Sequence, residues 1–109
     1  MNFDATVTHE GRWSRVRVQG KGGAGRVLSL LQVLSVDSAT WTTRGVLFDV
    51  RDLQPPLQPE EQLQLAQAAA DAFAQRRVAI LALPGRGCDA SGHRAFEDES
   101  AAQAWLADA

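Results

Sequence analysis

Residues 45–50 read Gly45-Val46-Leu47-Phe48-Asp49-Val50, a short and almost continuously apolar run. A run of this length without polar alternation is typical of a strand that is covered on both faces. The segment Val78-Ala79-Ile80-Leu81-Ala82-Leu83 has the same character. We therefore predict two neighbouring strands inside a sheet. The first should end at Val50, because the prolines of the segment Arg51–Pro56 lack amide donors and cannot extend a sheet.

The N-terminal part of the chain alternates between apolar and polar residues, which is the period of a half-buried strand. The apolar members are Phe3, Ala5 and Val7 in one segment and Val16 and Val18 in the next, where they alternate with Arg15, Arg17 and Gln19. Gly11 lies between the segments and can adopt the positive φ of a tight turn. We predict a β-hairpin whose polar outer face carries the arginines.

Two segments between the strands have helical periodicity. The first runs from about Ala24 to Val36, and Leu30 and Val33 widen its apolar stripe, so it should pack broadly on a sheet. The second begins at Pro59, with acidic residues near its start and Arg76 and Arg77 at its end, as the helix dipole favours. Its expected buried face is formed by Leu63, Ala66, Ala70 and Phe73.

The C-terminal part should add a short strand at Arg94–Glu97 and a last helix through Leu106, capped by Asp98. The complete pattern predicts an α/β fold. A mostly parallel sheet of four to five strands opens with the antiparallel hairpin and is flanked by helices. With 109 residues the chain fits one domain, residues 1–109.

Composition excludes several classes of protein. The 11 basic residues do not exceed the 13 acidic ones, so neither nucleic acid nor an anionic membrane surface is an expected partner. Cys88 is the one cysteine, which precludes an internal disulfide and a thiolate zinc site. The sequence has no apolar run long enough to span a bilayer and no signal-peptide pattern at Met1, so we expect a cytoplasmic protein.

Three segments resemble the SpoIIAA-like proteins, which are related to the STAS domains of anti-sigma-factor antagonists. They are Val16-Arg17-Val18-Gln19-Gly20, Val46-Leu47-Phe48-Asp49-Val50-Arg51-Asp52-Leu53, and residues 94–106. The resemblance implies a sheet of four or five strands flanked by helices. In relatives this fold is used as a protein-binding switch, and sometimes as a small-ligand or lipid-associated module.

Two departures from that resemblance bear on function. Sigma-regulating relatives carry a phosphorylated serine at the head of the helix after the central strand, but the stretch Leu53–Pro59 has neither Ser nor Thr. The phosphorylation switch is therefore not carried over. Relatives also place a helix between the last two strands, whereas Pro84–His93 is shorter than a parallel crossover normally requires. The last strand is expected to pair antiparallel or at an edge, leaving an open surface.

The strongest candidate site lies after the central strand, where open α/β sheets place ligands. Asp49 and Asp52 flank Arg51, and two carboxylates in different environments could divide acid and base roles. The alternative is structural: Arg51 pairs with one carboxylate, and the other caps loop amides. Gly85 and Arg86 in the loop of residues 85–92, and an exposed Trp13 on the hairpin, are further candidate contacts for a ligand or partner.

Other motifs point to chemistry less directly. The stretch Gly20–Gly25 matches the pattern G-x-G-x-x-G, which can hold a phosphate or simply form a flexible start to the first helix. Cys88, Asp89 and His93 lie too close in sequence for a triad assembled from distant segments. We expect no metal, no cofactor and no catalytic residue.

These observations predict a non-catalytic regulatory or protein-interaction domain. It would bind another protein or a second copy of itself through the hairpin edge and the loop of residues 85–92. The alternative is a module that binds a small ligand, such as a lipid, nucleotide or anion, near Gly20–Gly25 or Asp49–Asp52. An enzyme ranks third.

Overall fold

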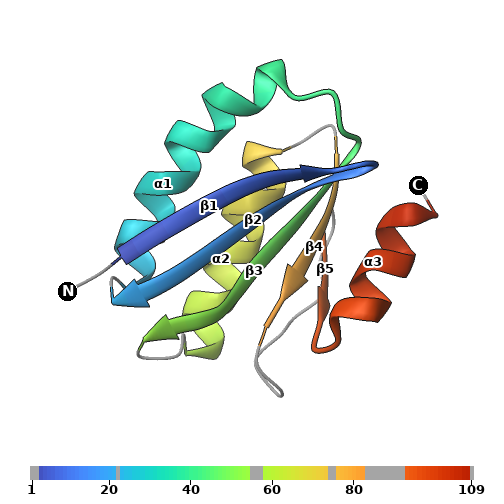
Figure 1. The fold of residues 1–109 in the computed structure, drawn as a ribbon. Helices are drawn as coiled ribbons and strands as arrows, with labels where there is room; N and C mark the ends of the chain where they lie inside the picture. The colour runs from blue at the N-terminus through green and yellow to red at the C-terminus, as the bar shows by residue number, and fades with distance from the viewer. Residues whose placement is uncertain (1–2, 22, 55–57, 74–75, 83–92, 109) are drawn as a thin grey trace.

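The computed structural model describes residues 3–21, 23–54, 58–73, 76–82 and 93–108, which form one mixed sheet and the helices that cover it (Figure 1). The elements in chain order are β1 (Phe3–Glu10), β2 (Trp13–Lys21), α1 (Gly23–Asp37), the 3-10 helix η1 (Ser38–Thr40), β3 (Gly45–Gln54), α2 (Pro59–Ala72), β4 (Arg77–Leu81), β5 (His93–Phe96) and α3 (Glu99–Ala107). The strand order is β1-β2-β3-β4-β5. The β1–β2 pair is antiparallel and the other pairs are parallel, so the predicted fold class is confirmed.

The hairpin turns over two residues, with Glu10 paired to Trp13. Gly11 has a φ of 71°, and Arg12 does not share this left-handed conformation. Glycine with positive φ at the first central position is typical of a type II′ turn, whose twist matches that of the two strands. This local preference brings β1 back along β2 and leaves the outer side of β1 as one edge of the sheet.

The predicted interior strands are β3 and β4, and they lie side by side in parallel. Val46, Phe48, Val78 and Ile80 face the side covered by α1 and α2, while Leu47, Ala79 and Leu81 belong to the cluster under α3. Both faces of these strands are therefore buried, which explains why their sequences show no polar alternation. β4 ends at Leu81, two residues before the predicted end.

β3 does not end at Val50 as we predicted. It continues to Gln54, and its pairing with β2 shifts by one residue between the pairs Arg17–Asp49 and Gln19–Asp52. The prediction was wrong because β2 supplies a hydrogen-bonding partner for this polar segment. Of the segment Arg51–Pro56, Pro55 and Pro56 follow the end of β3 and lie outside the described residues.

The larger core lies between the sheet and the pair α1 and α2. The buried helical residues of this core are Val27, Leu31 and Leu34 from α1 and Leu65, Ala66, Ala69 and Phe73 from α2 and its C-cap. Two predictions about these faces are wrong. Val33 is 66% exposed instead of widening the buried stripe, and Leu63 and Ala70 are only half-buried, since Leu65 and Ala69 point to the sheet instead.

α3 covers the opposite face of the sheet (Figure 1). Its N-cap is Asp98, as predicted, and the Asp98 carboxylate accepts a hydrogen bond from the backbone N–H of Ala101 at 3.1 Å. Ala102 and Leu106 complete a small apolar cluster with Leu47, Ala79 and Leu81. Because α3 is short, the face beyond it over β1 and the end of β3 stays open.

Three further expectations concern the pairing of β5, the end of α2 and membrane-spanning helices. β5 pairs in parallel with β4 at the sheet edge, so of the two expected arrangements the edge position is right and antiparallel pairing is wrong. α2 ends at Ala72, and Arg76 and Arg77 lie beyond it, where Arg77 begins β4. No helix among the described residues is both long enough and apolar enough to cross a membrane.

Candidate functional site

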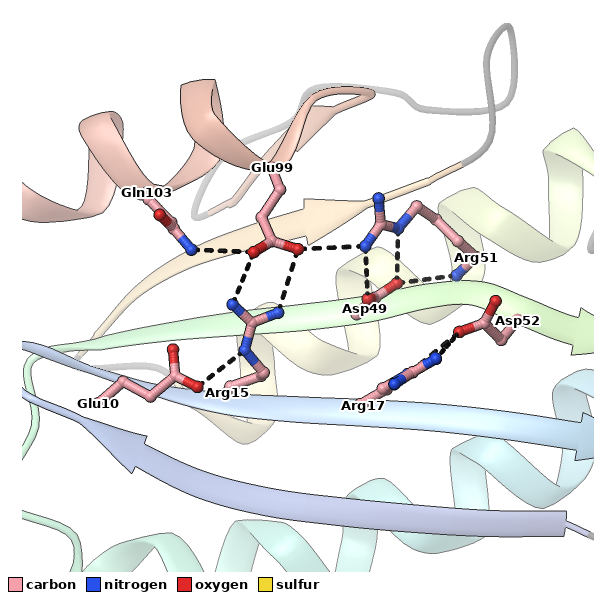
Figure 2. A network of polar contacts seen from close by, with 8 residues as sticks. All are labelled: Glu10, Arg15, Arg17, Asp49, Arg51, Asp52, Glu99 and Gln103. Carbon is pink, nitrogen blue, oxygen red and sulfur yellow. Dashed lines mark hydrogen bonds and ion pairs between the residues drawn. The ribbon is translucent and has the colours of Figure 1, made fainter.

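A cluster of charged side chains lies on the α3 side of the sheet, where β2, β3 and α3 meet (Figure 2). β2 contributes Arg15 and Arg17, β3 contributes Asp49, Arg51 and Asp52, and α3 contributes Glu99 in its first turn. The register places Arg17 directly opposite Asp49. The one-residue shift after this pair then brings Asp52 beside Arg17, so all three predicted site residues of β3 lie in this cluster, Asp49 and Arg51 in one network and Asp52 in a neighbouring pair.

Asp49 is the buried centre of this network, with only 2% of its side chain exposed. The Arg51 guanidinium donates from Nε to Asp49 Oδ1 at 3.0 Å and from Nη2 to Oδ2 at 2.9 Å, and the Arg51 backbone N–H donates to Oδ1 at 3.1 Å. Burial on its own would raise the pKa of Asp49. The hydrogen bonds from Arg51 and the nearby positive charges outweigh burial, so the pKa lies below its ordinary value and the carboxylate stays ionised.

Glu99 connects the helix to both strands. Arg15 donates to the two Glu99 oxygens at 2.9 and 3.3 Å, and Arg51 donates to Oε1 at 3.3 Å. Gln103, one turn further along α3, donates to Oε2 at 3.0 Å. The hydrogen bond from Arg15 is the main reason why the pKa of Glu99 is lowered. Arg15 also binds Glu10 at the end of β1, at 3.0 Å.

Asp52 forms a separate pair with Arg17 at the open end of the cluster. Arg17 donates to Asp52 Oδ2 from Nη2 at 2.6 Å and from Nε at 3.1 Å, and about half of each side chain is exposed. The structural alternative considered for Asp49 and Asp52 is therefore right for the Asp49–Arg51 pair. It is wrong for Asp52, which binds an arginine of β2 instead of loop amides.

The arrangement of this cluster does not suit acid–base catalysis by its carboxylates. Acid–base catalysis by two carboxylates needs environments that push their pKa values apart, with one carboxyl held protonated. Here the pKa values of Asp49 and Glu99 both move downward, because each carboxylate faces guanidinium groups. The described residues also contain no group of three or more His, Cys, Asp or Glu side chains that could hold a metal ion. The geometry suits a structural role, in which these ion pairs hold α3 on the sheet.

Trp13 lies on the face of β2 that carries Arg15 and Arg17, but that face is not open at Trp13. The indole is partly buried and packs against the small apolar cluster under α3, and its Nε1 atom is buried with no hydrogen-bond partner in the described part of the chain. The exposed contact that we expected is therefore absent, because α3 covers the start of β2. A binding role for Trp13 stays a prediction.

The remaining candidates divide into two groups. Gly85, Arg86, Cys88 and Asp89 lie outside the described residues, as does Gly22. Gly20 and Gly23 have φ values of 101° and 65°, a conformation that favours glycine. Gly20 lies near the end of β2 and Gly23 begins α1, so the glycine stretch connects the strand to the helix.

Sequence reasoning did not assign five of these polar side chains to the site, namely Glu10, Arg15, Arg17, Glu99 and Gln103. The two arginines are two residues apart and therefore lie on one face of β2, and Glu99 directly follows the N-cap residue of α3. These local patterns indicate where each side chain lies on its own element. Arg17 meets Asp52 through the parallel pairing of β2 with β3. Arg15 and Arg51 are linked through Glu99, which α3 brings back to the sheet from the far end of the chain.

A second surface of interest is the outer edge of β1, which pairs with no other described strand and is called the free edge, together with the neighbouring side of α1. A shallow groove between them is lined by Phe3, Gly25, Arg26, Ser29, Leu30 and Val33. Val33 and Val36 on α1 are 66% and 77% exposed and are the large apolar side chains that the described residues leave most open. An unpaired strand edge beside exposed apolar side chains is a common form of protein-binding surface.

No protein-family model matches the sequence, and neither does any curated protein. A solved structure of an uncharacterised protein of the DUF3478 family from Shewanella loihica PV-4, with a SpoIIAA-like fold, is similar to this chain. The two are 19% identical, the match covers 95% of this chain and 93% of that chain, and the TM-score is 0.50. At this identity the likeness concerns the fold alone: the chain has a SpoIIAA-like fold, as the sequence resemblance implied.

Proposed function

We propose that the chain is a non-catalytic regulatory or protein-interaction domain that binds an extended segment of a protein at the free edge of β1. The observation that carries the proposal is the eight-residue length of this edge beside the α1 groove. Strand addition of this kind takes affinity from main-chain hydrogen bonds and specificity from neighbouring side-chain sites.

The hairpin geometry indicates which groups of β1 are available. In a two-residue hairpin the closing pair, Glu10 and Trp13, is hydrogen-bonded, so alternate residues back to Asp4 bond to β2. The N–H and C=O groups of Ala5, Val7 and His9 therefore point to the free edge. The Ala5 N–H fits this pattern, because it donates to the neighbouring Asp4 carboxylate at 2.9 Å instead of to β2.

The charged cluster supports the non-catalytic part of the proposal. Arg51 already binds both Asp49 and Glu99, and a substrate would have to displace these internal ion pairs to engage the three side chains. The free hydrogen-bonding capacity of β1 needs no such displacement, apart from rotation of the Asp4 side chain.

A phage-displayed library of extended peptides tests the proposal. Selected peptides should slow the hydrogen exchange of the Ala5, Val7 and His9 amides, because these N–H groups would enter a new ladder. Ala5→Pro should abolish binding, since it removes one outward N–H without breaking a β1–β2 hydrogen bond. Ala5→Val is the matched control, because it keeps the N–H. Peptides that bind without protecting these amides would refute the edge as the binding surface.

A second candidate function is the binding of a small polar ligand. One open hollow on the sheet face brings together both segments that the sequence singled out for ligands, with Gly20 and Lys21 on one side and Asp52 on the other. Arg17 and Lys21 are balanced there by Asp4 and Asp52, so the charges favour a zwitterionic ligand over an anion. A thermal-shift panel of nucleotides, lipid headgroups, amino acids and metal ions tests this function, because a ligand that binds the folded state raises its stability.

A further inference from the structure

We propose that the partner at the β1 edge is a second copy of this chain, joined by antiparallel pairing of the two β1 strands into one continuous sheet. This inference rests on the proposed function and names its partner. The occupant is identified by three properties of the surface: its backbone pattern, its charge pattern along β1, and the charges at the two ends of α1.

The β1 edge has few of the features that usually keep strand edges apart; among them is the Asp4 carboxylate, which accepts a hydrogen bond from the outward Ala5 N–H. β1 has eight residues, with no lysine, arginine, proline or bulge, whereas β5 at the opposite edge has four residues and includes Arg94. Long unprotected edges tend to pair with another strand. The outward groups of Phe3, Ala5, Val7 and His9 can pair with the same groups of a second copy, since a two-fold contact uses one patch twice.

Charge selects the register of this contact. A two-fold axis at Thr6 places Ala5 opposite Val7 and Phe3 opposite His9 of the second copy, and sets Asp4 against the neutral Thr8. An axis at Val7 would set Asp4 against Glu10, and like charges directly opposite each other destabilise a strand pair. The axis at Thr6 therefore gives the longest pairing without a repulsive contact.

The position of α1 extends the contact beyond the strands. α1 starts beside the start of β1, where Phe3 pairs with Gly20, and the chain after α1 returns to the end of β1, where the His9 and Trp41 rings lie 5.5 Å apart. α1 thus runs in the same direction as β1 (Figure 1). When the two β1 strands pair antiparallel about an axis normal to the sheet, the two α1 helices lie antiparallel on the same side.

The charges of α1 suit an antiparallel copy of itself. α1 has two charged residues, Arg26 near its start and Asp37 at its end. Antiparallel alignment brings Arg26 of each copy toward Asp37 of the other. The exposed Val33 and Val36 lie between these charges and would be covered by the contact. An unrelated partner would have no reason to match this pattern, whereas a second copy matches it by symmetry.

Sedimentation velocity over a concentration series tests the inference on the full chain. We expect a monomer–dimer equilibrium. Val33→Arg and Ala5→Pro should each raise the dissociation constant of the dimer at least about tenfold, because one places charges in the apolar contact and the other removes a ladder donor. Gln67→Arg adds the same charge on the exposed side of α2 and should leave the constant unchanged. Val33 is exposed, so Val33→Arg keeps the test valid even where Ala5→Pro folds poorly.

A charge swap tests the antiparallel arrangement of the helices. Arg26→Asp and Asp37→Arg should each weaken the dimer about threefold to tenfold, and the double variant should recover most of the loss, because the pair forms between copies with reversed sign. A dimer that ignores Val33→Arg and the charge changes would overturn the inference. A chain that stays monomeric while its β1 edge captures peptides would overturn the inference and leave the proposed function standing.

Discussion

The two faces of the sheet are held in different ways. Among the described residues, a cluster of 16 buried residues under α1 and α2 joins helices and strands by apolar contact. The corresponding cluster under α3 has five buried residues in the same part of the chain, and the ion pairs of Arg15, Arg51 and Glu99 extend it. Apolar burial depends little on pH or salt, whereas ion pairs depend on both. The stability of the α1/α2 face and the attachment of α3 should therefore respond to different changes.

The largest expected effect is on the α1/α2 face. Phe48 is fully buried at the centre of the larger cluster, and Phe48→Ala should lower the free energy of unfolding by about 3–5 kcal/mol through lost burial and a new cavity. Urea unfolding followed by circular dichroism measures the change. A loss below about 1 kcal/mol would show that this face does not carry the stability that we assign to it.

Leu106→Ala makes the matched cavity under α3. Leu106 is 2% exposed, but α3 is a nine-residue helix at the edge of the core, so the helix can open without unfolding the sheet. We expect the free energy of opening α3 to fall by about 2 kcal/mol. Amide hydrogen exchange should then accelerate more in α3 than in β3, relative to the unchanged protein. Equal acceleration in both elements would show that the two faces unfold as one unit.

Asp49→Asn tests the buried ion pair. The substitution keeps the shape of the side chain but removes its charge, so the Arg51 guanidinium loses its closest counter-charge. We expect a loss of about 2 kcal/mol in urea unfolding at neutral pH. Asp52→Asn is the control on the exposed Arg17 pair and should cost less than about 0.5 kcal/mol. Similar losses in both variants would contradict the distinction between buried and exposed pairs.

The smallest expected effect is a pH dependence specific to the α3 face. Because the pKa values of Asp49 and Glu99 are lowered in the folded state, their contribution is complete above their ordinary values of 3.8 and 4.5. It is lost as the pH falls through the lowered values. Unfolding measured between pH 6 and about pH 3 should show stability falling with acid, with a shallower slope in Glu99→Gln and an unchanged slope in Phe48→Ala. An identical slope in Glu99→Gln and the unchanged protein would remove Glu99 from this account.

Local sequence patterns predicted most of the elements because the forces behind them act over a few residues. The alternation in β1 and β2, the glycine of the turn and the Asp98 cap each depend on neighbours in the chain. Hydrophobic periodicity was less informative about which face of α2 is buried. Its leucines and alanines lie on several sides of the helix, so periodicity alone selected Leu63 and Ala70 instead of Leu65 and Ala69.

Only the part of the candidate site formed by neighbouring residues of β3 was predicted from the sequence. Asp49 and Arg51 are two residues apart, so their pairing was weighed as an alternative from the sequence. Glu99 lies 48 residues after Arg51 and 84 after Arg15, and no local pattern relates such distant positions. The free edge of β1 was expected from the hairpin, whereas the exposure of Val33 depends on how α1 is rotated over the sheet.

The sequence by itself determined which segments become strands and helices and that β3 and β4 are buried on both faces, because hydrophobic period and chain stereochemistry are local properties. Tertiary structure alone decided that β3 continues to Gln54 beside β2, that α3 brings Glu99 to Arg15 and Arg51, and that the packing of α1 leaves Val33 exposed. These outcomes depend on which surfaces remain after the elements pack together, and packing brings together residues that are far apart in the chain.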